Sequence, residues 1–177
     1  VETYVAAKLF VDNWRWSGVP FYLRTGKNLP LKASEVRVQF RPTPNVLFAA
    51  RGDLDLLPNA LTLRLQPDEG IFLRFNGKVP GNTIATRPVR MYFGYDSEFG
   101  AYTPEAYERL LMDVIRGNQT LFMRRDEVEA AWNWIDPIPQ AWAEKSMKPQ
   151  GYTAGTWGPS SGVALIERDG RTWHEPD

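Results

Sequence analysis

Apolar and polar residues alternate along most of the first half of the chain, as they do in half-buried β-strands. Strand-like runs cover residues 4–11, 19–25, 35–41, 60–66, 71–76 and 87–93. The fourth and fifth runs flank Pro67-Asp68-Glu69-Gly70, a strong turn signal, and therefore predict a hairpin. Residues 46–58 show no clear pattern and are expected to be irregular. Because no helical pattern separates the strands, we expect a mostly antiparallel sheet with one apolar face.

Two helical patterns follow the strands. Thr103-Pro104-Glu105 is typical of a helix start, apolar residues from Tyr107 to Ile115 recur at helical spacing, and Gly117 is expected to end the helix. These helices would cover the apolar face of the sheet.

The second helix is expected to start near Asp126, where Asp126 and Glu129 fit a capping box, and Pro137 should kink or end it. From Lys148 onward we expect ordered coil, since Gly and Pro are frequent. The predicted fold class is α+β, a large mostly antiparallel sheet with helices packed on one face, in a single domain over residues 1–177.

Composition narrows the function classes. The 177 residues are 43% hydrophobic and 24% charged, which is typical of a globular domain. Lys and Arg total 21, as do Asp and Glu, so a nucleic-acid partner is not expected. Cysteine is absent, which excludes thiol nucleophiles and Cys-ligated zinc and is compatible with the cytoplasm. No apolar run approaches the length of a membrane span, so we expect no membrane partner.

The start of the chain and its histidine content bear on catalysis. The sequence lacks an initiator Met and enters a strand-like run at once, so we expect a fragment of a longer protein. His174 is the single histidine and lies three residues before the end, where we expect a solvated tail residue. No nucleotide-binding, zinc-protease or EF-hand motif is present, so we assign no catalytic residue and no metal site.

Lys27 and Lys32 are the first candidate binding residues. Lys27 follows the break at Thr25-Gly26, and Lys32 follows five residues later, after Pro30. Ammonium groups beside a glycine at a strand end suit a phosphate. The alternative is that both are solvated loop lysines, which are common.

Arginines on three predicted strands are the second candidate set. Arg24, Arg37 and Arg64 could line one anion-binding surface, or they could pair with acids such as Glu35 or Asp68. The amide of Gln66, at a strand end, could bond to sugar hydroxyls.

Several blocks of the chain resemble the C-terminal domain of the glucose-6-phosphate dehydrogenase family. The most specific is residues 13–27, which contain Gly-Val-Pro-Phe and Leu-Arg-Thr-Gly-Lys. Further similar blocks are residues 2–8, 60–70, 104–110 and 151–159, and their order and spacing match from end to end. Residues 167–173 resemble the bacterial form of the family.

This resemblance implies a function. Such enzymes oxidise D-glucose 6-phosphate to 6-phospho-D-glucono-1,5-lactone with NADP⁺, the first oxidative step of the pentose phosphate pathway. Their coenzyme domain and catalytic His/Asp pair would lie upstream of residue 1, so the fragment alone is expected to be inactive. By resemblance, Lys27, Lys32 and Gln66 bind the substrate, and the sheet forms the interface of a cytoplasmic homodimer or tetramer.

The resemblance also raises a second nucleotide site. Eukaryotic relatives bind a structural NADP⁺ on this sheet, and Arg24, Arg37, Arg64 and Trp173 match positions used there. Ala33 stands where those relatives carry a lysine, so we expect this site to be weak or absent. The alternative function is a stand-alone oligomerisation or sugar-phosphate-binding module without catalysis.

Overall fold

The computed structural model describes residues 2–42, 56–82, 85–100 and 106–176. Its strands are β1 (Tyr4–Phe10), β2 (Pro20–Gly26), β3 (Ser34–Gln39), β4 (Ala60–Gln66), β5 (Gly70–Lys78) and β6 (Thr86–Gly94). Its helices are α1 (Tyr95–Phe99), α2 (Ala106–Arg116), α3 (Arg125–Ile135), α4 (Pro137–Glu144) and α5 (Ser160–Glu167). All six predicted strands are confirmed to within a few residues. Most of the predicted irregular stretch and the start at Thr103 lie outside the described residues.

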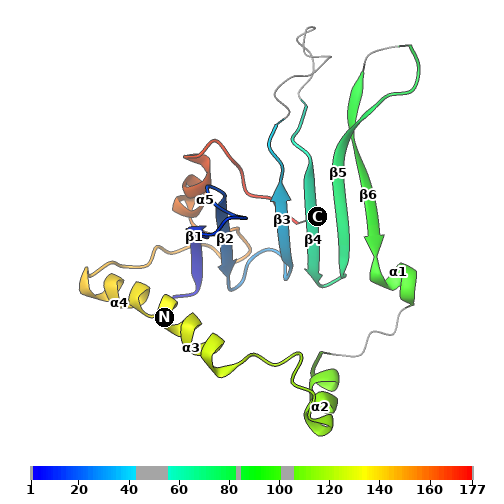
Figure 1. Cartoon of the computed structure of the whole chain (residues 1–177). Helices are drawn as coiled ribbons and strands as arrows, with labels where there is room; N and C mark the ends of the chain where they lie inside the picture. The colour runs from blue at the N-terminus through cyan, green and yellow to red at the C-terminus, as the bar shows by residue number, and fades with distance from the viewer. Residues whose placement is uncertain (1, 43–55, 83–84, 101–105, 177) are drawn as a thin grey trace.

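The strands form two antiparallel sheets that stand side by side in Figure 1. β1 pairs with β2, and the second sheet has the order β3-β4-β5-β6. The antiparallel α+β architecture is confirmed, but the strands are divided between two sheets. The division falls at residues 27–33, where Asn28 adopts a left-handed conformation with φ of 52° and Pro30 offers no N–H to a ladder.

Register in the four-stranded sheet separates an apolar face from a polar face. Because side chains alternate along a strand, register partners lie on the same face. Two cross-strand rows form the apolar face: Val36, Leu63, Ile71 and Phe93, and beside them Val38, Leu61, Leu73 and Met91. The other face carries Glu35 opposite Arg64, and Arg37 opposite Thr62.

Few apolar side chains are enclosed. Among the described residues, Ala60 and Ile166 are the buried apolar ones, at 1% and 5% exposure. Val36 and Met91, on the apolar face, are 47% and 61% exposed. The described elements therefore leave much of the apolar face open to solvent.

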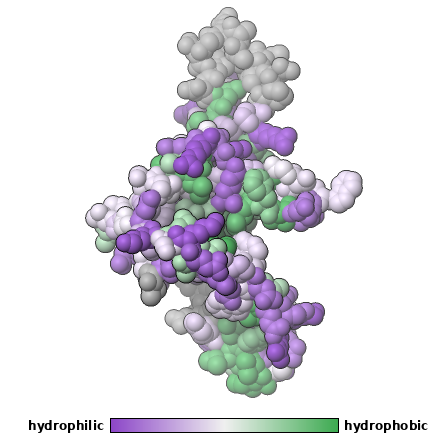
Figure 2. All heavy atoms as spheres, turned by 90° about the vertical axis from the view of Figure 1, so that its left-hand side faces the viewer, coloured by the Kyte–Doolittle hydropathy of each residue, from purple (hydrophilic) through white to green (hydrophobic). Residues whose placement is uncertain are grey.

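Helices α2, α3 and α4 form an arm that runs below the sheets in Figure 1, whereas we expected them over a sheet face. On α2, Val114 is 62% and Ile115 is 78% exposed. Figure 2 shows apolar surface gathered at the bottom of the molecule, at the height of α2. An amphipathic helix needs a surface for its apolar stripe, and the described part of this chain supplies none for α2. Within the described ranges, every helix is too short or too polar to cross a bilayer.

One expectation about helix positions is wrong. Helix α5 lies where we predicted coil; its sequence signal is the apolar run 163–166 after Pro159. The second predicted helix, α3, starts at Arg125, which confirms the expected start near Asp126.

The predicted capping box of α3 is also wrong. The Glu127 carboxylate accepts the backbone N–H of Arg124 at 2.9 Å. Glu129 instead binds the Arg125 side chain at 2.7 Å, because residues four apart face each other on a helix. Helix α2 ends before Gly117, which has a φ of 68°, as predicted.

Candidate functional site

The predicted substrate residues lie at one edge of the two sheets, which we call the loop edge. It comprises the end of β2, residues 27–33, the start of β3 and the end of β4, all at the lower side of the sheets in Figure 1. Lys27 follows β2 directly, and Lys32 lies two residues before β3. Ser34 at the start of β3 is the register partner of Gln66. The fold therefore brings Lys27, Lys32 and Gln66 to the same edge, each exposed.

Lys27 is held through its backbone. Its N–H donates to the Thr3 carbonyl at 2.8 Å, which extends the β1–β2 ladder by one residue. Its carbonyl accepts a hydrogen bond from the Tyr152 hydroxyl at 2.6 Å. Among the described residues, the Lys27 side chain has no ion pair or hydrogen bond, so its ammonium group is available to a ligand.

A shallow hollow of about 370 Å³ adjoins this lysine. Its lining comprises Thr3, Lys27, Asn28, residues 149–152 and Ala154, and Lys27 is the charged side chain among them. One ammonium group amid neutral hydrogen-bonding groups suits an anionic, hydroxylated ligand. Lys32 does not line the hollow, so the structure does not show both lysines closing on one anion.

Arg64 pairs with Glu35, which confirms for this arginine the expected alternative to an anion-binding role. Its Nε lies 2.7 Å from Oε1 of Glu35, and the side chains are 16% and 6% exposed. The guanidinium also lies over the Phe72 ring, 4.9 Å from its centroid. Asp68, the other acid considered, is exposed in the turn between β4 and β5.

Arg24 contacts residues on both sides of α5: Trp157 before it, and Trp173 and His174 in the C-terminal tail, which comprises residues 168–176. The Arg24 guanidinium lies 4.4 Å from the ring centroid of Trp157 and 4.9 Å from that of Trp173. It also donates to the His174 carbonyl at 3.2 Å. Burial lowers the pKa of Arg24, but cation–π contact with two indole rings stabilises its charge.

His174 joins the two sheets. Its Nε2 lies 3.3 Å from Oε2 of Glu35 on β3, while its carbonyl binds Arg24 on β2. The structure therefore corrects the expectation of a solvated terminal histidine. Arg37, the third arginine, donates to the Thr62 hydroxyl at 3.4 Å. All three arginines bind groups of this chain, and Trp173 donates its indole N–H to the Gly162 carbonyl at 2.9 Å.

A cluster that the sequence did not reveal ties the end of α5 to the two-stranded sheet. The Asp169 carboxylate accepts the Tyr22 hydroxyl and lies 2.6 Å from Lys8 Nζ. The hydrogen bond from Lys8 holds the pKa of Asp169 below its ordinary value and raises the pKa of Lys8. Burial raises the pKa of Tyr22. No local pattern could show this cluster, since 147 residues separate Tyr22 from Asp169.

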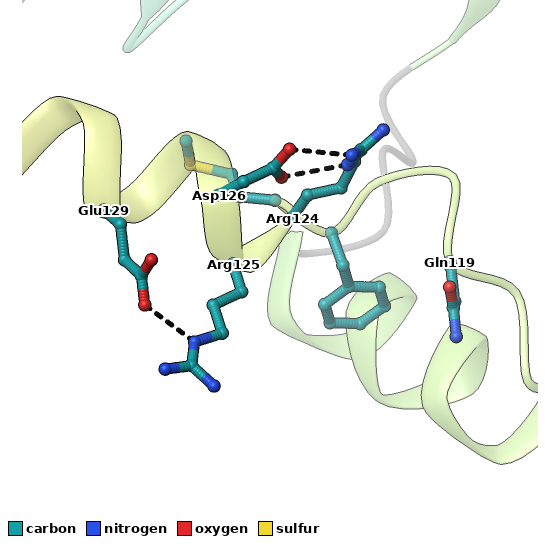
Figure 3. A pocket seen from close by; sticks show the side chains of 7 residues that line it. Gln119, Arg124, Arg125, Asp126 and Glu129 are labelled. Atoms are coloured by element: carbon teal, nitrogen blue, oxygen red, sulfur yellow. Dashed lines mark hydrogen bonds and ion pairs between the residues drawn. The ribbon is translucent and has the colours of Figure 1, made fainter.

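A larger hollow of about 810 Å³ lies at the start of α3. Figure 3 shows its arginines directed at carboxylates of the same helix: Arg124 at Asp126, and Arg125 at Glu129, each at 2.7 Å. Because each guanidinium is already paired with a carboxylate that also lines the hollow, the hollow is a poor anion site. Within the described ranges, acidic and histidine side chains form no group that could hold a metal ion.

A family model described as glucose-6-phosphate dehydrogenase, C-terminal domain, matches residues 1–174. The chain belongs to the glucose-6-phosphate dehydrogenase family. Glucose-6-phosphate 1-dehydrogenase of Mycolicibacterium smegmatis is 52% identical over 174 residues, which cover 98% of this chain and 35% of that protein. The Rhizobium meliloti protein of the same name is 51% identical over 175 residues, with the same coverage. The resemblance drawn from the sequence is therefore confirmed.

Solved structures of the glucose-6-phosphate dehydrogenase family share the fold. The enzyme of Mycobacterium avium aligns with a TM-score of 0.81 at 34% identity, over 99% of this chain and 36% of that one. A glucose-6-phosphate dehydrogenase in complex with its substrate glucose-6-phosphate aligns with a TM-score of 0.82 at 32% identity, over 98% and 35%. The chain thus spans about a third of the length of these family members.

Proposed function

We propose that this chain is the substrate-binding and subunit-contact part of a cytoplasmic glucose-6-phosphate dehydrogenase. The whole protein would oxidise D-glucose 6-phosphate to 6-phospho-D-glucono-1,5-lactone with NADP⁺, in the pentose phosphate pathway. The observation that carries this proposal is the family match over residues 1–174, together with Lys27, Lys32 and Gln66 on the loop edge.

The residues of the loop edge suit a sugar phosphate. Lys27 presents an exposed ammonium group beside a neutral hollow and would bind the phosphate, with Lys32 in support. Gln66 carries an amide that can donate to and accept from hydroxyl groups. Fixing the far side of the sugar phosphate would increase the rate by positioning C1 for hydride transfer.

The relatives are about three times as long as this chain. We assign the hydride transfer to the remaining part of the full-length protein. NADP⁺ would supply the hydride acceptor there. His174 contacts Glu35 through its ring and Arg24 through its backbone carbonyl, and we assign it a structural role between the two sheets.

Self-association is part of the proposal. The apolar rows on the four-stranded sheet, with Val36 and Met91 about half exposed, offer a surface for a second copy. Stable interfaces bury about 1,200–2,000 Å² in total, and a sheet face of this kind can contribute to such an area.

The direct test is Lys27→Ala in the full-length protein, with Lys145→Ala as control. Lys145 is an exposed lysine at the end of α4 and does not line the hollow beside Lys27. Loss of a charge-assisted bond to phosphate should raise the KM for glucose 6-phosphate about 10- to 100-fold, and the KM for NADP⁺ should stay unchanged. An unchanged kcat/KM would show that Lys27 is only a solvated loop residue.

A further inference from the structure

The backbone around Lys27 is fastened by a chain segment that lies 125 residues away in the sequence. In Figure 1 the orange coil after α4 returns to β1 and β2 before it enters α5. Tyr152 lies in this coil, and its hydroxyl donates to the Lys27 carbonyl at 2.6 Å. The same hydroxyl lies 3.2 Å from the Thr3 carbonyl, so the two carbonyls share its hydrogen in a bifurcated hydrogen bond.

A second bond from the same coil fixes the next residue. The Gly155 N–H donates to the Asn28 carbonyl at 2.8 Å. Asn28 has a φ of 52°, in the left-handed region, which Asn adopts more readily than most other non-glycine residues. The turn after Lys27 therefore depends on hydrogen bonds from the coil as well as on its own sequence.

Ring packing holds the Tyr152 hydroxyl in place. The rings of Tyr152 and Tyr4 lie 5.3 Å apart at an interplanar angle of 54°. Tyr4 in turn fits against Gly26 and Gly162, where an added Cβ would come closer than 3.0 Å to its side chain. Burial raises the pKa of Tyr4, in agreement with its enclosed position. The ring contact thus fixes where the Tyr152 hydroxyl oxygen lies.

We propose that Tyr152 is a positioning residue for substrate binding, because its hydroxyl fixes the backbone from which Lys27 reaches the phosphate. This inference rests on the proposed role of Lys27. A lysine side chain has four rotatable bonds, so its ammonium group is well placed only where the backbone beneath it is fixed. Tyr152 itself would not touch the phosphate.

Tyr152→Phe in the full-length protein tests the proposal, because it removes the hydroxyl and keeps the ring. We expect the KM for glucose 6-phosphate to rise about 3- to 10-fold, as for the loss of one hydrogen bond, with little change in kcat or in the KM for NADP⁺. Tyr22→Phe is the matched control: it removes a hydroxyl bond between the same sheet and the C-terminal segment, but away from Lys27. It should lower the melting temperature and leave the KM unchanged.

A double-mutant cycle decides whether Tyr152 acts through Lys27. In the Lys27→Ala background, Tyr152→Phe should have no further effect on the KM. An equal effect in both backgrounds, or an unchanged KM in Tyr152→Phe alone, would overturn the positioning role while the role of Lys27 stands. An unchanged KM in Lys27→Ala would instead remove the proposed function of Lys27, and the inference with it.

Discussion

Arg64 and Glu35 face each other across β4 and β3 and form an ion pair, with 2.7 Å between Nε and Oε1. The second carboxylate oxygen of Glu35 lies 3.3 Å from Nε2 of His174, in the C-terminal tail. One carboxylate, 6% exposed, therefore links the four-stranded sheet to the tail. The tail also encloses Arg24 of the two-stranded sheet, so the sheets are joined through residues 173–174.

Removing the Glu35 charge should destabilise the protein. Glu35→Gln leaves the Arg64 guanidinium without its carboxylate in a largely enclosed position, and should lower the free energy of unfolding by about 1–3 kcal/mol. Urea unfolding measures this change. Glu129→Gln is the control, because its pair with Arg125 is exposed and should contribute less than about 0.5 kcal/mol. Equal effects of the two substitutions would contradict a special role for Glu35.

The Lys8–Asp169 pair predicts a pH-dependent stability. The pKa of Asp169 is held below 3.8, so its contribution is present above that value and is lost as the pH falls through the folded pKa. The pKa of Lys8 is raised above 10.5, so its contribution is present below that value and is lost as the pH rises through the folded pKa.

Asp169→Asn should therefore lower the melting temperature most between about pH 5 and 9. Below the folded pKa of Asp169 the variant and the parent protein should melt alike, because both then carry a neutral side chain at this position. Glu144→Gln, which removes an exposed carboxylate of α4, provides the control. A difference that persists unchanged at low pH would show that packing, not charge, explains the effect of Asp169→Asn.

At the start of α3, replacing the neighbouring acids Asp126 and Glu127 should lower the free energy of unfolding by different amounts. Glu127→Ala removes the acceptor of the Arg124 N–H and should cost about 0.5–1 kcal/mol of unfolding free energy. Asp126→Ala removes an exposed pair with Arg124 and the acceptor of the Glu127 N–H at 3.1 Å. Both contacts are exposed, and the higher helix propensity of Ala offsets part of their loss, so we expect at most about 0.5 kcal/mol. Thermal unfolding of both variants measures the difference. A larger loss of unfolding free energy in Asp126→Ala than in Glu127→Ala would instead support Asp126 as the capping residue expected from the sequence.

The apolar sheet face predicts self-association. Light scattering of the chain should give the mass of a dimer, and Val36→Lys should shift it to a monomer, since it adds charge to an apolar row. Gln39→Lys, on the opposite face of β3, should leave the mass unchanged. A monomeric mass for the unmodified chain would contradict self-association through the apolar face. That face would then be expected to pack against another part of the full-length protein.

The sequence by itself determined the strands, the hairpin and the placement of Lys27 directly after a strand. Alternation over six to eight residues is a local property, and the Pro67-Asp68-Glu69-Gly70 turn favours the register of β4 and β5 through its own residues. The motif blocks also identified the family, because they match over almost the whole chain.

Only the tertiary structure decided which charges meet and how Lys27 is held. From the sequence, either Glu35 or Asp68 could pair with any of three arginines. The register of β3 against β4 places Glu35 opposite Arg64, and these two residues form the ion pair. The bonds from Tyr152 to Lys27 and from Arg24 to His174 join residues 125 and 150 positions apart. Such contacts follow from the return of the tail to the sheets, which depends on packing between remote segments and leaves no periodic pattern in the sequence.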